Sequence, residues 1–120
     1  MECDTFNGNV VLVPAPIVAE LGHVDGAHFP HAMGDIDYGL RVRSSGFGVV
    51  QVQATVGMCE RNPLKPPEGG PISRLRAVAG PKRLPPTAWW VFCMRHGGRL
   101  ALPYFAKPYL WSLGGRRPSR

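Results

Sequence analysis

The sequence is poor in cysteine, and its few cysteines lie far apart. The three thiols, Cys3, Cys59 and Cys93, are odd in number, and no two of them have the Cys-x-x-Cys spacing of a zinc or redox site. This excludes a disulfide framework of the kind that holds small secreted domains together. A reducing compartment, the cytoplasm, is therefore the expected location, and Cys59 is expected to be buried and unreactive.

Long apolar runs are also absent. No apolar segment reaches the roughly 18 residues that a membrane-spanning helix needs. Residues 1–5 lack the basic start and the apolar core of a secretory signal peptide. The sequence therefore predicts neither export nor a membrane span, and it leaves open a peripheral contact with the inner face of a membrane.

Acidic residues are almost missing from the second half of the chain. Residues 61–120 contain twelve Lys and Arg side chains and one acidic residue. Residues 1–60 contain two Arg side chains and seven acidic residues. Such a basic half indicates either an anionic partner, such as membrane phosphate, nucleic acid or a charged substrate, or a solvated basic surface. No RNA-recognition or helix-turn-helix signature accompanies the charge, so nucleic acid is not an expected partner.

Glycine and proline, by contrast, are abundant. The 120 residues include 15 Gly and 13 Pro, about twice the average usage, so much of the chain is expected to form loops. In the first half, the apolar patterns predict a strand buried on both faces, a short helix, a second helix and an edge strand. These elements are expected at residues 9–13, 15–22, 34–45 and 47–54.

The middle of the chain is expected to be a linker or a wrapping arm. Residues 63–85 contain six prolines and five basic side chains, a composition that permits only a brief regular element near residues 72–78. Residues 86–120 are expected to form a C-terminal helical tail, because prolines precede a helical segment and glycines follow it. Pro103 and Pro108 are expected to interrupt the last apolar segment.

Two carboxylates at the start of the second predicted helix carry the clearest candidate chemistry. Asp35 and Asp37 follow a loop that contains His23, His28 and His31. Carboxylates beside a loop can serve as general bases, and His28, His31 and Asp35 could together bind a metal, although this Gly- and Pro-containing loop does not enforce the geometry. Carboxylates in a first helical turn also offset the helix dipole, so a purely structural interpretation stays open.

Four segments follow one another in a recognisable order. They are Phe6-Asn7-Gly8-Asn9-Val10-Val11-Leu12-Val13-Pro14, Leu21-Gly22-His23-Val24-Asp25, His31-Ala32-Met33-Gly34-Asp35-Ile36-Asp37-Tyr38-Gly39-Leu40-Arg41 and Gly57-Met58-Cys59-Glu60-Arg61-Asn62-Pro63. Together they resemble the C-terminal part of family 2 glycosyltransferases, which have the GT-A fold. The resemblance implies an α/β fold in residues 1–62, a partial GT-A-like (Rossmann-like) mixed sheet with flanking helices, followed by the Pro-rich arm and the C-terminal helices.

The resemblance also assigns roles to the acidic residues. The family motif reads Glu-Asp-x-Asp-Leu-x-x-Arg, and its second acidic residue is the catalytic base; Asp35 falls on that position. Gly34 replaces the preceding Glu, whereas Asp37 and Arg41 match the later positions. A base is needed because a sugar hydroxyl is a poor nucleophile until its proton is removed. The implied reaction is inverting transfer of a sugar from a nucleotide-sugar donor to a saccharide or lipid-linked acceptor, as in the synthesis of cell-envelope polysaccharide.

The residues expected to bind substrate lie around this base. They are Asn7, Gly8, His31, Gly34, Asp37 and Arg41. In the family, an N-terminal half binds the nucleotide sugar together with a divalent metal, Mg or Mn, through a separate Asp-x-Asp motif. This chain is expected to begin after that half, so no metal ligand is expected within it, and its activity in isolation is doubtful.

Two other interpretations stay open. One is a non-catalytic, truncated remnant whose exposed sheet edge pairs with another chain. The other is a small basic module that binds anionic lipid or nucleic acid. For the lipid, Trp89, Trp90 and Phe92 beside Arg95 are the residues suited to a membrane interface, although they are equally suited to packing in a core.

Overall fold

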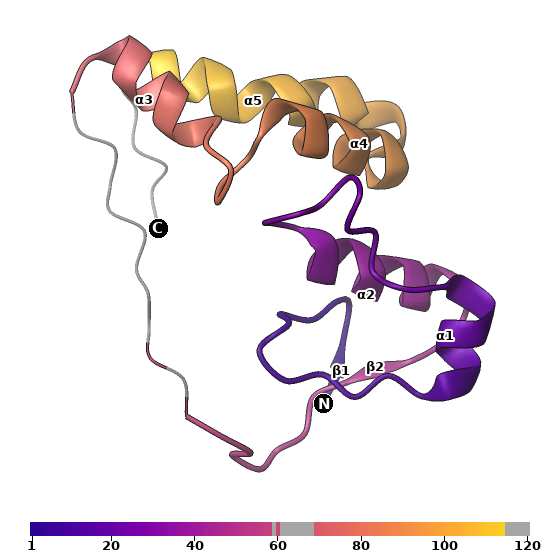
Figure 1. Cartoon of the computed structure of the whole chain (residues 1–120). Helices are drawn as coiled ribbons and strands as arrows, with labels where there is room; N and C mark the ends of the chain where they lie inside the picture. Colours follow the sequence, from indigo (N-terminus) through magenta and orange to yellow (C-terminus); the bar gives the residue numbers. More distant parts are fainter. Residues whose placement is uncertain (59, 61–68, 115–120) are drawn as a thin grey trace. The chain divides into compact units, whose positions relative to one another are not determined.

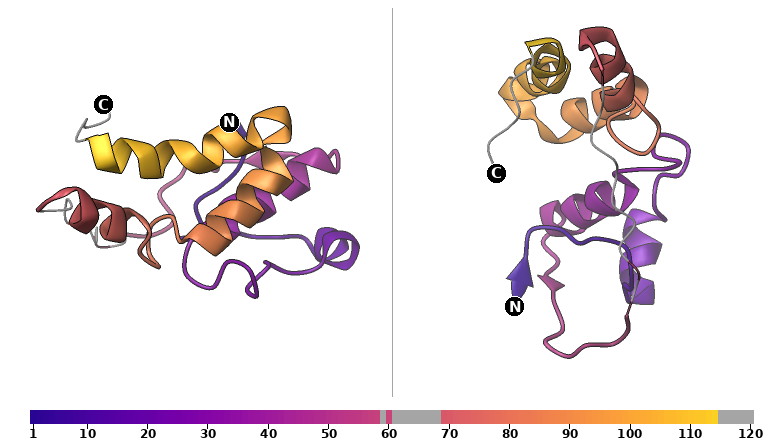
Figure 2. Two further views of the ribbon diagram at one scale, coloured as in Figure 1. Left: turned by 90° about the horizontal axis from the view of Figure 1, so that it is seen from above. Right: turned by 90° about the vertical axis from the view of Figure 1, so that its left-hand side faces the viewer.

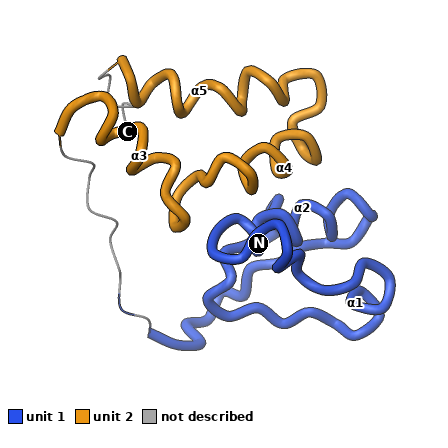
Figure 3. The backbone as a smooth tube through the Cα atoms, turned by 45° about the horizontal axis from the view of Figure 1, so that its top comes forward, with its two compact units in different colours: residues 1–63 blue, residues 64–120 orange. Residues whose placement is uncertain are grey.

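The computed structural model describes residues 1–58, 60 and 69–114. The chain forms two compact units, Met1–Pro63 and Leu64–Arg120, which Figure 3 distinguishes by colour. The first unit contains two short strands and two helices, and the second consists of helices (Figure 1).

The two helices of the first unit are confirmed where the sequence predicts them. Helix α1 spans Ala15–Leu21, and Gly22 follows it with a φ of +73°, which glycine adopts without steric strain. Helix α2 spans Gly34–Ser44, with two carboxylates in its first turn and Arg41 and Arg43 in its last. The negative charges therefore lie near the positive N-terminal end of the helix dipole, and the positive charges lie near its negative C-terminal end, which stabilises the helix.

The sheet of the first unit is small. Strand β1, Glu2–Cys3, pairs with strand β2, Val49–Val50, in antiparallel orientation, with Cys3 opposite Val49. The edge strand predicted at residues 47–54 is thus reduced to two residues. No further strand occurs in the described parts of the chain, and the larger mixed sheet implied by the resemblance stays a prediction.

The buried strand predicted at residues 9–13 is wrong in this structure. The segment has no regular secondary structure, and Val10 and Leu12 are 72% and 92% exposed. A strand that is apolar on both faces needs hydrogen-bonded neighbours and a covering layer on each side. Strands β1 and β2 pair with each other and provide neither for this segment.

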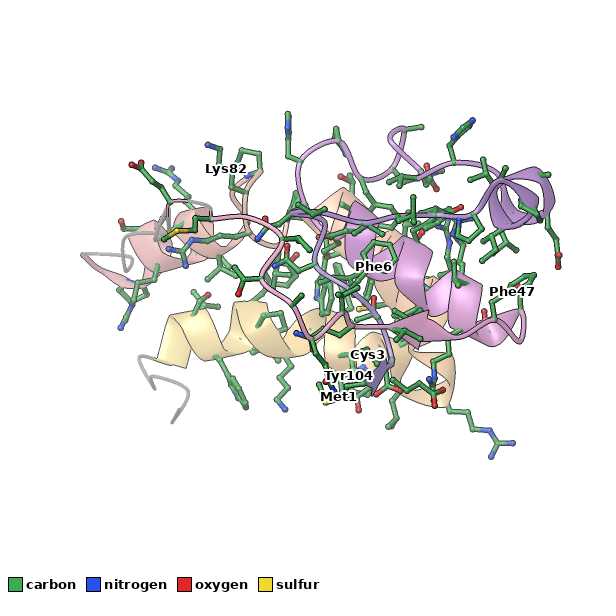
Figure 4. The ribbon with its side chains drawn as sticks, turned by 90° about the horizontal axis from the view of Figure 1, so that it is seen from below. Met1, Cys3, Phe6, Phe47, Lys82 and Tyr104 are labelled. Carbon is green, nitrogen blue, oxygen red and sulfur yellow. The ribbon has the colours of Figure 1, made fainter. Side chains whose placement is uncertain are left out.

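Helix α2 carries the core of the first unit. Its Tyr38 and Val42 are buried together with Val49 of β2, and six partly buried residues pack around them: Cys3, Phe6, Val13, Ile17, Leu21 and Phe47. Phe6, labelled with Phe47 in Figure 4, meets the Tyr38 ring edge-on at a centroid distance of 6.4 Å. The N-terminal segment, α1 and β2 are therefore all fixed against one helix.

The second unit packs two helices against a third. Helix α3 spans Pro71–Val78, helix α4 Pro86–His96, the short 3-10 helix η1 Gly98–Leu100 and helix α5 Ala101–Gly114. Helices α3 and α4 both contact α5 (Figures 1 and 2). Helix α3 coincides with the brief element predicted inside the Pro-rich segment, and α4 with the predicted start of the helical tail.

Helix α5 continues through both prolines that were expected to interrupt it. Pro103 stands in the first turn, where a backbone donor is not needed, whereas Pro108 lies inside the helix and removes one hydrogen bond. Contacts on either side of Pro108 hold the helix. The Trp89 indole donates to the Phe105 carbonyl at 3.2 Å, and the Tyr109 hydroxyl donates to a carbonyl of the α3–α4 loop at 2.8 Å.

Candidate functional site

The structure brings Asp35 together with a turn that lies 27 residues earlier. The Gly8 N–H donates to Asp35 Oδ2 at 2.8 Å, and the N–H of Ile36 donates to Asp35 Oδ1 at 2.9 Å. Gly8 permits this approach, because a Cβ there would lie 3.2 Å from the Cβ of Asp35. The Asn7–Gly8 turn and the partly exposed Asp35 carboxylate, both predicted as site residues, therefore form one surface feature.

The backbone just before Asp35 is strained. Met33, which precedes α2, has a φ of +69°, and no other described residue except glycine has a positive φ. A left-handed conformation at a residue with a side chain costs about 1–3 kcal/mol and is found preferentially at functional sites. It sets the direction from which the chain enters α2 and hence the position of the Asp35 carboxylate.

Gly34 is explained by packing. The residue is buried, and a Cβ at this position would lie 3.0 Å from Val24 Cγ1 and 3.4 Å from Phe29 Cβ. A side chain at this position, such as the Glu of the family motif, would therefore require Val24 or Phe29 to move. Any contact of Gly34 with a substrate would have to be made by its backbone.

Asp37 and Arg41 hold the loop between α1 and α2. Asp37 is fully buried, with its Oδ2 3.0 Å from Arg41 Nε, and the same guanidinium donates to the carbonyls of Leu21 and His23 at 3.0 Å each. The Tyr38 hydroxyl adds a 2.9 Å hydrogen bond to another carbonyl of this loop. A carboxylate with no exposed surface does not reach a substrate, so in this structure Asp37 positions the site and does not line it.

The loop that contains His23, His28 and His31 does not have the arrangement that a metal site of His28, His31 and Asp35 would need. His28 Nδ1 lies 2.9 Å from Asp25 Oδ2, and the backbone N–H of His28 donates to Asp25 Oδ1. His31 is exposed and makes no hydrogen bond with Asp35. Within residues 1–58, 60 and 69–114, no three His, Cys, Asp or Glu side chains are grouped to hold a metal ion, so the site of His28, His31 and Asp35 is not formed.

One positioning contact was missed from the sequence. The Thr5 hydroxyl donates to the Ile36 carbonyl at 2.9 Å, which fixes the N-terminal segment beside the first turn of α2. Gly39 makes this possible, because it lets the backbone at Thr5 approach the helix closely. A glycine in the middle of a helix is unfavourable by roughly 0.5–1 kcal/mol relative to alanine. Its presence at position 39 is the feature of the sequence that could have indicated a close approach of another segment.

Gly39→Ala is expected to destabilise the first unit by about 1–3 kcal/mol. The new Cβ would overlap the Thr5 hydroxyl and lie 3.0 Å from Thr5 Cα, so the N-terminal segment must move. Hydrogen exchange of the α2 amides measures the effect locally. Gly48→Ala is the matched control, since nothing lies within 4 Å of its Cβ; equal exchange in the two variants would contradict the close packing at Gly39.

The two thiols that the structure describes, Cys3 and Cys93, offer no competing site. Cys93 is buried in α4, and burial raises the pKa of its thiol, which opposes thiolate chemistry. Cys3 packs against the core of the first unit. Cys59, expected to be buried, lies outside the described residues, as does most of the last of the four segments that carry the resemblance.

Comparison with known proteins adds no relative. No protein-family model, curated protein or solved structure matches the chain. Among the helices that the structure describes, none is long and apolar enough to cross a membrane.

Proposed function

We propose that the first unit is the acceptor side of an inverting family 2 glycosyltransferase, with Asp35 as the general base. The observation that carries the proposal is the 2.8 Å hydrogen bond between the Gly8 N–H and Asp35 Oδ2. It joins two separate segments that both resemble the family, and it does so at the carboxylate that the resemblance designates as the base.

The geometry suits proton abstraction. A carboxylate has about four lone-pair positions, so the two backbone hydrogen bonds to Asp35 leave acceptor capacity for a hydroxyl. These two bonds fix the carboxylate, and a base held within hydrogen-bond reach of a sugar hydroxyl takes its proton as the oxygen attacks the anomeric carbon. The nucleoside diphosphate leaves from the opposite face, which inverts the configuration at that carbon.

The substrates follow from the same proposal. The donor is a nucleotide sugar, and the acceptor is a saccharide or a lipid-linked saccharide that approaches Asp35 past the Asn7–Gly8 turn and His31. As the resemblance implies, Mg or Mn would bind with the diphosphate on a donor side formed by other polypeptide. The metal supplies charge neutralisation for the leaving group when it is bound.

A non-catalytic alternative is favoured by one observation. Val10 and Leu12 are largely exposed in a segment whose pattern suits a buried strand, so the segment is suited to pair with the sheet of another polypeptide. In the glycosyltransferase this partner is the donor side. In a remnant it would be an unrelated sheet, with no sugar transfer.

Transfer assays on the protein purified from its native source separate these proposals. Its intact mass first shows whether a donor side is part of the same polypeptide, and nucleotide sugars are then offered with saccharide acceptors. The expected product has the anomeric configuration opposite to that of the donor, as read by NMR. Retention of configuration would exclude Asp35 as a base in a single displacement, and no transfer from any donor would favour the remnant.

A further inference from the structure

The second unit is basic throughout its described part. Residues 69–114 contain seven Lys and Arg side chains and no Asp or Glu. Several of the cations are exposed, among them Arg76, Lys82 and Arg99, and Figure 4 labels Lys82 in the turn between α3 and α4. Within residues 69–114, therefore, no acidic side chain offsets this positive charge.

Helix α5 exposes apolar side chains on the face that α3 and α4 leave uncovered. Leu102 and Leu110 are both 63% exposed, and the other large exposed apolar side chains of the helix are Tyr104, Trp111 and Leu113. Lys107 is the one charged residue of α5, and its Nζ lies 4.4 Å from the centroid of the Trp111 ring. By helical geometry, Leu102, Leu110 and Leu113 lie on one side of α5, and Lys107 and Trp111 lie along the flank next to Leu110.

We infer that the exposed face of α5 binds the surface of an anionic phospholipid bilayer, with the helix lying in the plane of the interface. A helix of 14 residues is about 21 Å long, too short to cross a hydrocarbon core of about 30 Å. Leucines enter the boundary of the acyl chains, Trp and Tyr rings lie at the level of the headgroups, and Lys and Arg approach the phosphates.

Charge complementarity favours a bilayer over other occupants. Nucleic acid offers phosphates to the cations but no apolar layer for Leu102, Leu110 and Leu113. A second copy offers an apolar face, yet its residues 69–114 would bring seven further cations and no acidic side chain toward the first. An anionic bilayer provides both an apolar layer and negative charge.

Vesicle sedimentation with the 120-residue chain tests the inference. The chain is expected to bind vesicles of phosphatidylcholine mixed with phosphatidylglycerol, to bind phosphatidylcholine alone weakly, and to dissociate as salt screens the charges. All three tryptophans, Trp89, Trp90 and Trp111, belong to the second unit, so a blue shift of their fluorescence should accompany binding. Equal binding to both kinds of vesicle, or to neither, would overturn the inference.

The leucines supply the decisive variants. Leu102→Ser/Leu110→Ser is expected to weaken vesicle binding by at least about tenfold, because both side chains lose their transfer into the interface. Both positions are exposed, so circular dichroism should show an unchanged helix content. Val10→Ser/Leu12→Ser, which changes two exposed apolar residues of the first unit, is the matched control and should bind as the original chain does.

Each competing occupant has its own signature. Undiminished vesicle binding by the leucine variant would mean that charge alone is responsible. Binding to a polynucleotide but not to vesicles would assign the surface to nucleic acid, and self-association that the leucine variant abolishes, without vesicle binding, would assign it to a second copy. Each result overturns the inference, and none involves a sugar substrate, so the proposed transferase function is tested separately.

Discussion

Asp35→Asn is expected to lower the rate of sugar transfer by about 10²–10⁴-fold and to leave the affinity for the nucleotide sugar unchanged. The amide cannot take a proton from the acceptor hydroxyl. Its oxygen can still accept the hydrogen bond that the Gly8 N–H now donates at 2.8 Å, so the turn and the helix entry should keep their positions. Turnover by the protein from its native source and the Kd of the donor are the two measurements.

The control for this variant is Asp4→Asn, which removes the same charge from the same unit. The Asp4 side chain is 83% exposed and pairs with Arg43 at 3.2 Å on the surface, so its loss should change neither turnover nor donor binding. Normal turnover of the Asp35 variant would refute its role as the base. Equal losses in both variants would show that net charge, and not the position of Asp35, matters.

Arg41→Met is expected to destabilise the first unit by about 3–5 kcal/mol. The substitution leaves the fully buried Asp37 without this counter-charge, and it removes the donors at 3.0 Å from the carbonyls of Leu21 and His23. The loop after α1 should then detach from α2. Hydrogen exchange of the α2 amides reports this loss directly, whereas tryptophan fluorescence does not, because every tryptophan lies in the second unit.

Arg43→Met is the matched control, two residues further along the same helix. Arg43 bonds to Glu2 and Asp4, whose side chains are 69% and 83% exposed, and exposed ion pairs contribute about 0–1 kcal/mol. Exchange should therefore change far less than in the Arg41 variant. If both variants lost the same protection, the burial of Asp37 would have no special energetic role.

The helices could be predicted because their signals are local. Pro86 at the start of α4 and Gly97 after its end are recognisable in sequence, as are the carboxylates and arginines at the two ends of α2. The strand at residues 9–13 was not predictable in the same way. Its apolar pattern describes a preference for a buried sheet, but a strand forms only where another strand accepts its hydrogen bonds.

For the candidate site, too, some features follow from the local sequence and others follow from tertiary contacts. The sequence by itself determined where α1, α2 and α4 form, that the second half is basic and that Asp35 opens a helix, since propensity, capping and charge act between near neighbours. Only the tertiary structure decided that Gly8 meets Asp35, that Asp37 is buried under Arg41, and that α5 passes through Pro108. Asp37 and Arg41 are only four residues apart, but the burial of this pair depends, like the other two outcomes, on contacts between residues far apart in sequence.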